Sequence, residues 1–171
     1  MKKNQKGFSL IELLIVVAII LIIAAIAIPN LLRARMAANE SSAVGSVRTL
    51  VTSQVTFQST WGIGYANTLT ALGTPAAGCG TATSTNSCLI DPVLTTGIKS
   101  GYNLNTASAG GAGTAASPNT TFGASAWPIT VGSTGTRAFC ADESGVIRYN
   151  TTGTQITTTD VACQAVTNVL Q

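Results

Sequence analysis

The sequence opens with MKKNQKGFSLIELLIVVAIILIIAAIAIPN, residues 1–30, and this stretch decides the architecture of the chain. The segment from Phe8 to Pro29 holds 22 residues, of which only Ser9 and Glu12 are polar. As a helix it would be about 33 Å long, close to the thickness of the apolar core of a bilayer. Three lysines precede it within the first six residues, as is typical of the cytoplasmic flank of a membrane helix.

A secretory signal peptide and a plain membrane anchor are two competing interpretations of this stretch. A signal peptide has a shorter apolar region of about 7–15 residues, followed by small residues at its cleavage site. Here the run is longer, and Pro29 is followed by asparagine, two leucines and an arginine. A plain anchor leaves Glu12 unexplained, because a carboxylate at the centre of a membrane segment costs roughly 2.5–3.5 kcal/mol. Position alone still allows Glu12 to lie in the headgroup layer, where the cost is smaller.

The residues around Glu12 resemble the processing signature of type IV prepilins and the related pseudopilins. In that family a short basic leader ends in glycine, phenylalanine usually follows, and a glutamate stands four positions further on, ahead of a long apolar helix. Gly7, Phe8, Glu12 and Pro29 all occupy the positions that the family has for them. The resemblance covers the leader and the apolar run, and the combination is far more specific than any one of its members.

The resemblance implies that an aspartyl prepilin peptidase cuts after Gly7 and N-methylates the new terminus at Phe8. The resulting amine is mostly protonated at neutral pH, because a free α-amine titrates near pH ~8. The resemblance further implies that Glu12 of one subunit receives the Phe8 amine of its neighbour, which makes the pair a register device. Phe8 and Glu12 are four residues apart and share a helix face, so a pair within one chain also stays open.

Pro29 lies inside the predicted helix, where it removes one backbone hydrogen bond and is expected to kink the rod. Residues 8–30 are apolar on all sides, whereas residues 31–61 are amphipathic, with serines and threonines opposite an apolar stripe. The stripe, predicted to pack on the chain's own globular domain, consists of Val44, Val47, Leu50, Val51, Val55, Phe57 and Trp61. Ser42, Ser46, Thr49, Ser53 and Thr56 are assigned to the opposite side. Solvation is the favoured interpretation of four charged residues, with pairing between subunits as the alternative: Arg33, Arg35, Glu40 and Arg48. Two glycines just after Trp61 mark the end of the helix.

The four cysteines indicate an oxidising compartment. They are Cys79, Cys88, Cys140 and Cys163, an even number without a C-x-x-C pair in a chain that has no histidine. A zinc site would need four widely scattered thiolates, so no metal site is predicted. Disulfides in an exported domain are the better interpretation, and three connectivities are possible. We favour Cys79–Cys88 around a small Thr/Ser loop and Cys140–Cys163 around the C-terminal section.

Residues 62–171 are predicted to form a small antiparallel sheet on the amphipathic helix half, an α+β fold that the pilin resemblance also implies. The clearest element is a hairpin with strands at 136–141 and 146–149, joined by a turn that ends in glycine. Its residues 135–145 look like a stretch found in many pilins and pseudopilins. The other expected elements are a short helix at 67–72, a loop at 75–87, a strand at 101–105, an exposed loop at 106–121, and a strand within 122–131, where Pro128 favours an edge or a bulge.

Several function classes find no support in the sequence. Beyond the first six residues the six remaining basic residues balance the six acidic ones, so no basic footprint for nucleic acid is present. Without histidine the usual serine and cysteine triads are excluded, and no phosphate-binding glycine loop occurs. Asp142, Glu143 and Asp160 are interpreted as solvated acids of turns, since their spacing is unlike that of a calcium loop. We predict neither an enzyme nor a cofactor.

The sequence therefore predicts a structural subunit of a bacterial type IV pilus, with a leader at 1–7, a membrane and filament-core helix half at 8–30, an amphipathic half at 31–61 and a globular domain at 62–171. Its expected partners are identical subunits, the inner membrane, prepilin peptidase and the pilus assembly machinery. It would lie in the inner membrane before assembly and in an extracellular filament afterwards, serving adhesion, motility or DNA uptake. A pseudopilin of a type II secretion system and a monomeric membrane-anchored binding protein are the two alternatives.

Overall fold

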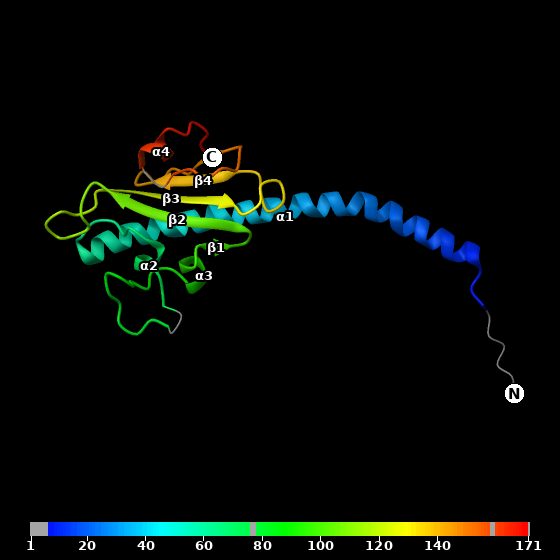
Figure 1. Ribbon diagram of the computed structural model, residues 1–171, viewed down its shortest axis with the longest axis horizontal. Coiled ribbons are helices and arrows are strands. Elements are labelled where there is room, and N and C mark those ends of the chain that lie inside the picture. Colours follow the sequence, from blue (N-terminus) through cyan, green and yellow to red (C-terminus); the bar gives the residue numbers. More distant parts are fainter. Residues whose placement is uncertain (1–6, 76–77, 158–159, 171) are drawn as a thin grey trace. The chain divides into compact units, whose positions relative to one another are not determined.

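The computed structural model describes residues 7–75, 78–157 and 160–170, without the side chains of 160 and 161, so most of the expected leader and its lysines lie outside the described residues. The chain divides into two compact units, residues 1–35 and residues 36–171. Figure 1 labels the elements along the chain except β5. The elements are α1 (Leu10–Trp61), α2 (Leu69–Leu72), α3 (Pro92–Thr95), β1 (Ile98–Lys99), β2 (Tyr102–Ala109), β3 (Thr121–Pro128), β4 (Ala138–Asp142), β5 (Arg148–Asn150) and α4 (Asp160–Gln164).

The second unit contains one antiparallel sheet of five strands in the order β1-β2-β3-β4-β5 (Figure 1). Together with the long N-terminal helix, this sheet confirms the predicted α+β fold of the type IV pilin-like kind. The expected hairpin is also confirmed, because Phe139 of β4 pairs with Tyr149 of β5 and the Asp142–Gly145 turn is closed by a backbone hydrogen bond. The expected helix at 67–72 is found as α2, which Thr68 caps by accepting the N–H of Ala71.

Residues 36–61 of α1 cover one face of the sheet, and this layer holds the main core. Val47, Leu50 and Phe57 are fully or almost fully buried there. The residues that β2, β3 and β4 direct toward this core alternate along each strand, as the pleat requires. They are Tyr102, Leu104, Ala124, Ala126, Phe139 and Ala141. The small alanines of β3 lie at the centre of this face, where large side chains would keep the helix away from the sheet.

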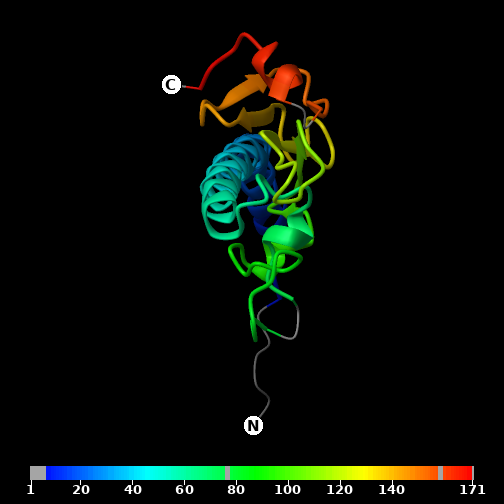
Figure 2. The same cartoon turned by 90° about the vertical axis from the view of Figure 1, so that its left-hand side faces the viewer.

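The opposite face of the sheet carries a second, smaller core. Ala138 and Cys140 of β4 pack there with Ile156 and Cys163. Figure 2 shows β4 and β5 between this part of α1 and the C-terminal segment that contains α4. Every residue of β4 is buried, because β4 is covered on both faces.

Two expectations about the strands were wrong. The stretch 106–121 is not an exposed loop throughout: Thr106–Ala109 belong to β2, Thr121 begins β3, and Thr106 is fully buried. Pro128 does not place its strand at an edge, since β3 lies between β2 and β4 and Pro128 is its last residue. A proline at a strand end leaves the ladder of the preceding residues intact, which is why a central strand accepts it here.

The helix stripe was predicted correctly at its centre and wrongly at its border. Val55 is half exposed, whereas Ser46 and Ser53, assigned to the outer side, are buried together with Gln54. Each of these polar side chains has a partner: Ser46 donates to the Ser42 carbonyl and Ser53 to the Leu89 carbonyl. Hydrogen bonding of this kind removes most of the cost of burying a polar group. An assignment of these serines to the outer side because they are polar was therefore wrong.

Candidate processing and assembly segment

The first turn of α1 is capped by its own acidic residue. Ser9 stands immediately before Leu10, and the Glu12 Oε2 atom accepts the backbone N–H of Ser9 at 3.0 Å. The Ser9 carbonyl in turn accepts the N–H of Leu13. Ser-x-x-Glu is the signature of a capping box, in which the glutamate at the third helical position binds the N-cap amide. The carboxylate also lies at the positive end of the helix dipole, where negative charge is stabilising.

The peptide bond between Gly7 and Phe8 lies just outside the helix in irregular backbone. The Phe8 side chain is 84% exposed, and an added Cβ at Gly7 would meet no heavy atom within 4 Å. This peptide bond is thus free of the helical hydrogen bonds that would withhold it from an enzyme. Gly7, Phe8 and Glu12 lie within one short segment, as the sequence requires, with the acid on the first helical turn.

The helix beyond this turn presents apolar side chains all round. Exposed leucines, isoleucines and valines follow one another from Leu10 to Leu32. By length and composition α1 can cross a membrane, and no residue in its most apolar stretch is buried. Among the described residues of the first unit, 7–35, nothing covers this apolar surface, so it needs lipid or other protein chains around it.

Pro29 lies inside α1, which continues as helix on both sides of it. Proline has no backbone N–H, so one hydrogen bond of the helical ladder is missing at this position. The kink expected there stays a prediction.

Glu40 is the main charged residue that the sequence analysis misplaced. Its side chain is buried on α1, and the residue is only 7% exposed. The Oε1 atom accepts the N–H groups of Thr136 and Arg137 and the Thr136 hydroxyl, while Oε2 receives the Arg137 guanidinium at 2.7 Å. Burial alone would raise the pKa of Glu40, but these hydrogen bonds and the charge of Arg137 hold that pKa below its ordinary value. The pair fastens the helix of the second unit to the segment that enters β4.

Asp142 is the second acid whose surroundings differ from the prediction. It is fully buried at the end of β4, where Arg148 donates to its Oδ2 atom at 3.0 Å and Ser144 donates its N–H and hydroxyl to Oδ1. Its neighbour Glu143 is exposed, as expected for a turn, while the side chain of Asp160 lies outside the described residues. Among the described residues, no group of three or more acidic, cysteine or histidine side chains is placed to hold a metal ion.

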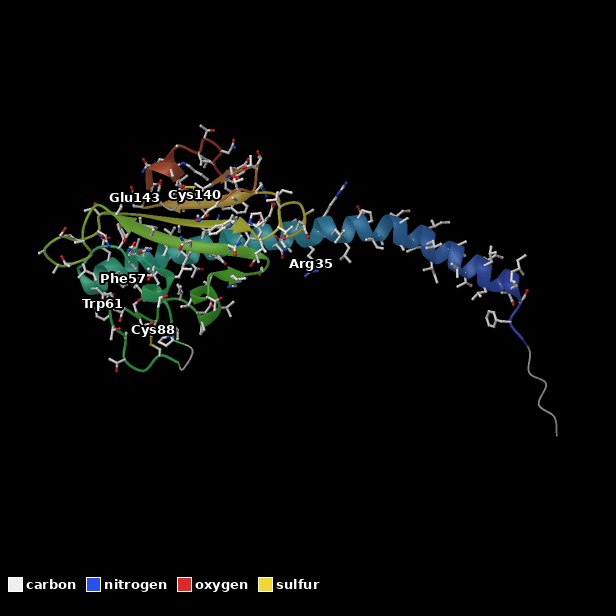
Figure 3. The ribbon with its side chains drawn as sticks, viewed as in Figure 1. Arg35, Phe57, Trp61, Cys88, Cys140 and Glu143 are labelled. Atoms are coloured by element: carbon white, nitrogen blue, oxygen red, sulfur yellow. A yellow bond between two sulfur atoms is a disulfide. The ribbon has the colours of Figure 1, made fainter. Side chains whose placement is uncertain are left out.

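Two disulfides close the second unit, and they join the pairs that the sequence analysis favoured. Cys79–Cys88 closes a surface loop next to α2, and Cys140–Cys163 ties α4 to the outer face of β4. Figure 3 labels Cys88 and Cys140, which lie on opposite sides of the sheet. Cys140 and Cys163 are buried, whereas Cys79 is exposed. Both disulfides therefore act within residues 36–171.

The fold and the N-terminal segment together define a chain of type IV pilin-like architecture with a prepilin-type start. The family model described as the prokaryotic N-terminal methylation motif matches residues 2–28. This match and the relatives below confirm the resemblance inferred from Gly7, Phe8 and Glu12.

Two relatives each match about a third of the chain. The type IV wide pilus major component PilA4 of Thermus thermophilus is 52% identical over 56 residues, which make up 33% of this chain and 43% of the relative. The type IV major pilin protein PilA of Myxococcus xanthus is 50% identical over 54 residues, 32% of this chain and 24% of the relative. The matches thus span less than half the length of each relative. No solved structure matches the chain.

Sequence reasoning missed the roles of two acidic residues of α1, one in each unit. The capping role of Glu12 was overlooked, although the Ser-x-x-Glu spacing from Ser9 to Glu12 signals it directly. The burial of Glu40 had no comparable signal, because its partners Thr136 and Arg137 lie almost a hundred residues further along the chain.

Proposed function

We propose that this chain is the structural subunit of a bacterial type IV pilus. The observation that carries the proposal is the order Gly7, Phe8, Glu12 and then an apolar surface that nothing in its own unit covers. The methylation-motif match over residues 2–28 and the similarity to two type IV pilins support it. The work of the protein is assembly, without a catalytic site or a cofactor of its own.

In this proposal prepilin peptidase cleaves between Gly7 and Phe8 and methylates the new amine of Phe8. Cleavage removes the lysines of the leader from the helix and leaves one cationic amine beside an apolar surface. Methylation keeps the charge, so the amine still requires an acidic partner when it is buried.

Glu12 supplies that partner. One carboxylate oxygen, Oε2, is already held by the Ser9 amide, which fixes the side chain on the first turn. The other oxygen remains available for the Phe8 amine of a neighbouring subunit or, in the alternative geometry, of the same chain. A pair between neighbours fixes the axial stagger of two helices, because only one register brings both charges together.

Before assembly the apolar half of α1 anchors the protein in the inner membrane. During assembly the same surface moves from lipid to a core of identical helices, so one apolar surface serves both states. Residues 36–171 form the exported part, whose disulfides suit an oxidising compartment. The filament would then extend outside the cell, built by the pilus assembly machinery.

The experiment that tests this function is the intact mass and N-terminal peptide sequence of the protein isolated from its own host. We expect a chain that begins at Phe8 with one additional methyl group, recovered in filaments sheared from the cell surface. A chain that keeps Met1 to Gly7 in cells with active prepilin peptidase would refute the proposal and leave a plain membrane anchor. A processed chain recovered only from periplasmic assemblies would instead identify a pseudopilin.

A further inference from the structure

We propose that residues 36–171 carry a binding site for a neutral saccharide beside the C-terminal end of α1. A hollow of about 350 Å³ lies there, within the size range of small-molecule sites. Its walls come from the end of α1, the segment after it, α2, the disulfide-closed loop and the connection between β2 and β3. They are lined by Phe57, Ile63, Tyr65, Ala66, Asn67, Ala71, Ser84, Thr85, Ser108, Gly111, Ala112, Gly113 and Asn119.

Asn119 fixes one wall of this hollow. The residue is only 8% exposed, and its Nδ2 atom donates to the Tyr65 carbonyl at 2.9 Å and to the Ser108 hydroxyl at 2.8 Å. Its backbone also pairs with the segment around Gly64, accepting the N–H of Tyr65 and donating to the carbonyl of Ile63. Residues far apart in sequence are thereby locked together before any ligand arrives.

Gln54 stabilises the same wall from behind. Its amide group is fully buried, accepts the N–H of Ala66 at 2.7 Å and donates to the Ala66 carbonyl at 2.8 Å. The remaining amide proton goes to the hydroxyl of Thr106 at 2.9 Å. The backbone of Tyr65, Ala66 and Asn67 is therefore held in place, which lowers the ordering cost of binding. A preformed polar wall of this kind is typical of a ligand site.

Polar groups of the lining remain available to a ligand. Both amide protons of Asn119 are used, but its Oδ1 atom accepts no hydrogen bond from any described residue, and it is not among the fully buried unpaired atoms. Asn67 uses its Oδ1 atom to accept the Ser108 N–H, which leaves its amide protons for a ligand. Tyr65 and Ser84 add hydroxyl groups that make no hydrogen bond to the described residues.

This set of groups matches a sugar. Each sugar hydroxyl is both a donor and an acceptor, so it pairs with amide and hydroxyl groups, while the C–H faces of the ring pack on the accessible side chains of Ile63 and Ala112. Figure 3 shows Phe57 at the α1 end of this region, close to Trp61. None of the lining residues is charged, which indicates a neutral ligand.

Glu143 adds an argument against an anionic ligand. Burial raises the pKa of Tyr65, and the negative charge of Glu143 raises that pKa further. A negative charge that disfavours ionisation of the Tyr65 hydroxyl also disfavours an acid that binds this group. All residues of the site belong to residues 36–171, so its presence does not depend on pilus assembly.

The test is saturation-transfer NMR on the full chain in dodecylphosphocholine micelles, a detergent that contains no sugar. The probes are the methyl glycosides of glucose, galactose and N-acetylglucosamine, with methyl glucuronide as the anionic comparison. We expect saturation transfer to at least one neutral glycoside and none to the glucuronide at equal concentration. The proposal is overturned if no neutral glycoside receives saturation up to roughly 20 mM, a concentration that would reveal even millimolar affinity.

Matched variants locate the site. Ala112→Leu places a larger side chain on the exposed rim of the hollow and should weaken binding at least about tenfold, or about 1.4 kcal/mol. Ala115→Leu changes the same exposed loop away from the lining and should leave the affinity within about twofold. Tyr65→Phe keeps the ring beside Phe122 and should also weaken binding. Unchanged affinity in both Ala112→Leu and Tyr65→Phe would show that the sugar binds elsewhere.

Discussion

Residues 7–35 and residues 36–171 use apolar side chains in opposite ways. In the first region leucines, isoleucines and valines are exposed along the helix, and its main fixed polar interaction is the cap between Ser9 and Glu12. In the second region two cores cover both faces of the sheet, and ion pairs and disulfides add fixed links between its segments. The second region completes its burial within one chain, whereas the first leaves its apolar surface for lipid or other chains.

This difference separates assembly from folding. Substitutions in the first region should change insertion or polymerisation while the free energy of unfolding of residues 36–171 stays the same. Substitutions in the second region should change the free energy of unfolding of residues 36–171 while insertion and polymerisation stay the same. Each prediction below tests one side of this separation.

The largest effect is expected from Glu12→Leu, which removes the acid that we propose as the partner of the Phe8 amine. A buried cation left without its acid costs about 3–5 kcal/mol, and the cost recurs at every subunit of a filament. We expect surface filaments to fall below detection by shearing and electron microscopy, while the chain still inserts into the membrane.

Glu143→Gln is the control for Glu12→Leu, because it removes an exposed acid of the second region. It should leave the filament yield unchanged. Normal filaments with Glu12→Leu would contradict the proposed pairing and favour a headgroup position for this carboxylate. Loss of membrane insertion would show instead that Glu12 acts before assembly.

The next largest effect is expected from removing the Cys140–Cys163 disulfide by a double alanine substitution. The disulfide joins cysteines 23 positions apart in the sequence. Closing a loop of this size in the unfolded chain contributes about 3 kcal/mol to the free energy of unfolding. Both cysteines are buried, so the cavities left by alanine add to the loss. Urea unfolding of the detergent-solubilised full chain, followed by tryptophan fluorescence, measures the change.

The double alanine variant of Cys79 and Cys88 is the matched comparison. That bond closes a separation of only 9 residues, and Cys79 is exposed. Its removal should cost about 2 kcal/mol, less than the loss at Cys140–Cys163. An equal or larger loss at Cys79–Cys88 would mean that the surface loop contributes more to folding than its burial indicates.

The sequence predicted those parts of the molecule that local pattern controls. The apolar run, the glycine end of α1, the hairpin at Asp142–Gly145 and the disulfide pairs depend on residues that are close in sequence or few in kind. The long helix was expected to end near Trp61, and it ends there. The prepilin-type start was also evident, because its residues follow one another within seven positions.

Parts that depend on distant partners were not predictable in the same way. The stretch after Asn105 contains no large apolar residue and was interpreted as a loop, yet Thr106 is buried because Gln54 and Gly123 satisfy its hydroxyl. Glu40 was interpreted as solvated, yet Arg137, which lies 97 residues away in the sequence, makes its burial possible. Asp142 was interpreted in the same way, although its partner Arg148 lies across the predicted hairpin. In each case a polar side chain entered the interior with its hydrogen-bond partners, which composition does not reveal.

A smaller effect is expected from Glu40→Leu. The change leaves the N–H groups of Thr136 and Arg137 and the partly exposed Arg137 guanidinium without their acceptor. Because Arg137 retains access to water, we expect a loss of about 2 kcal/mol in the free energy of unfolding, below the cost of a fully buried broken pair. Glu40→Gln keeps an acceptor oxygen and should lose about half as much. Filament assembly should persist in both variants, and its loss would contradict the separation of the two regions.

The smallest effect is the pH dependence that Glu40 confers on residues 36–171. Its pKa is lowered in the folded chain, since hydrogen bonds from Thr136 and Arg137 together with the Arg137 charge outweigh burial. A group with a lowered pKa stabilises the folded state above its ordinary value of 4.5, and this stability is lost as the pH falls through the lowered value. Arg137, Arg48 and Tyr102 are the titratable groups near this carboxylate, and the ordinary pKa values of all three lie far above this range.

Comparison with Glu40→Gln isolates this contribution, because both proteins contain the same other acidic residues. The stability advantage of the native chain over Glu40→Gln, measured by urea unfolding, should be constant from pH 7 to about 5.5 and shrink below about 4.5. An advantage that stays constant down to pH 3 would mean that Glu40 is not protonated there even in the unfolded chain, which its ordinary pKa contradicts. An advantage that shrinks already near pH 6 would show that the folded chain raises the pKa of this carboxyl. The ion pair with Arg137 would then lower the pKa of Glu40 by less than burial raises it. The contact between α1 and the segment that enters β4 would in that case gain no stability from the charge of Glu40.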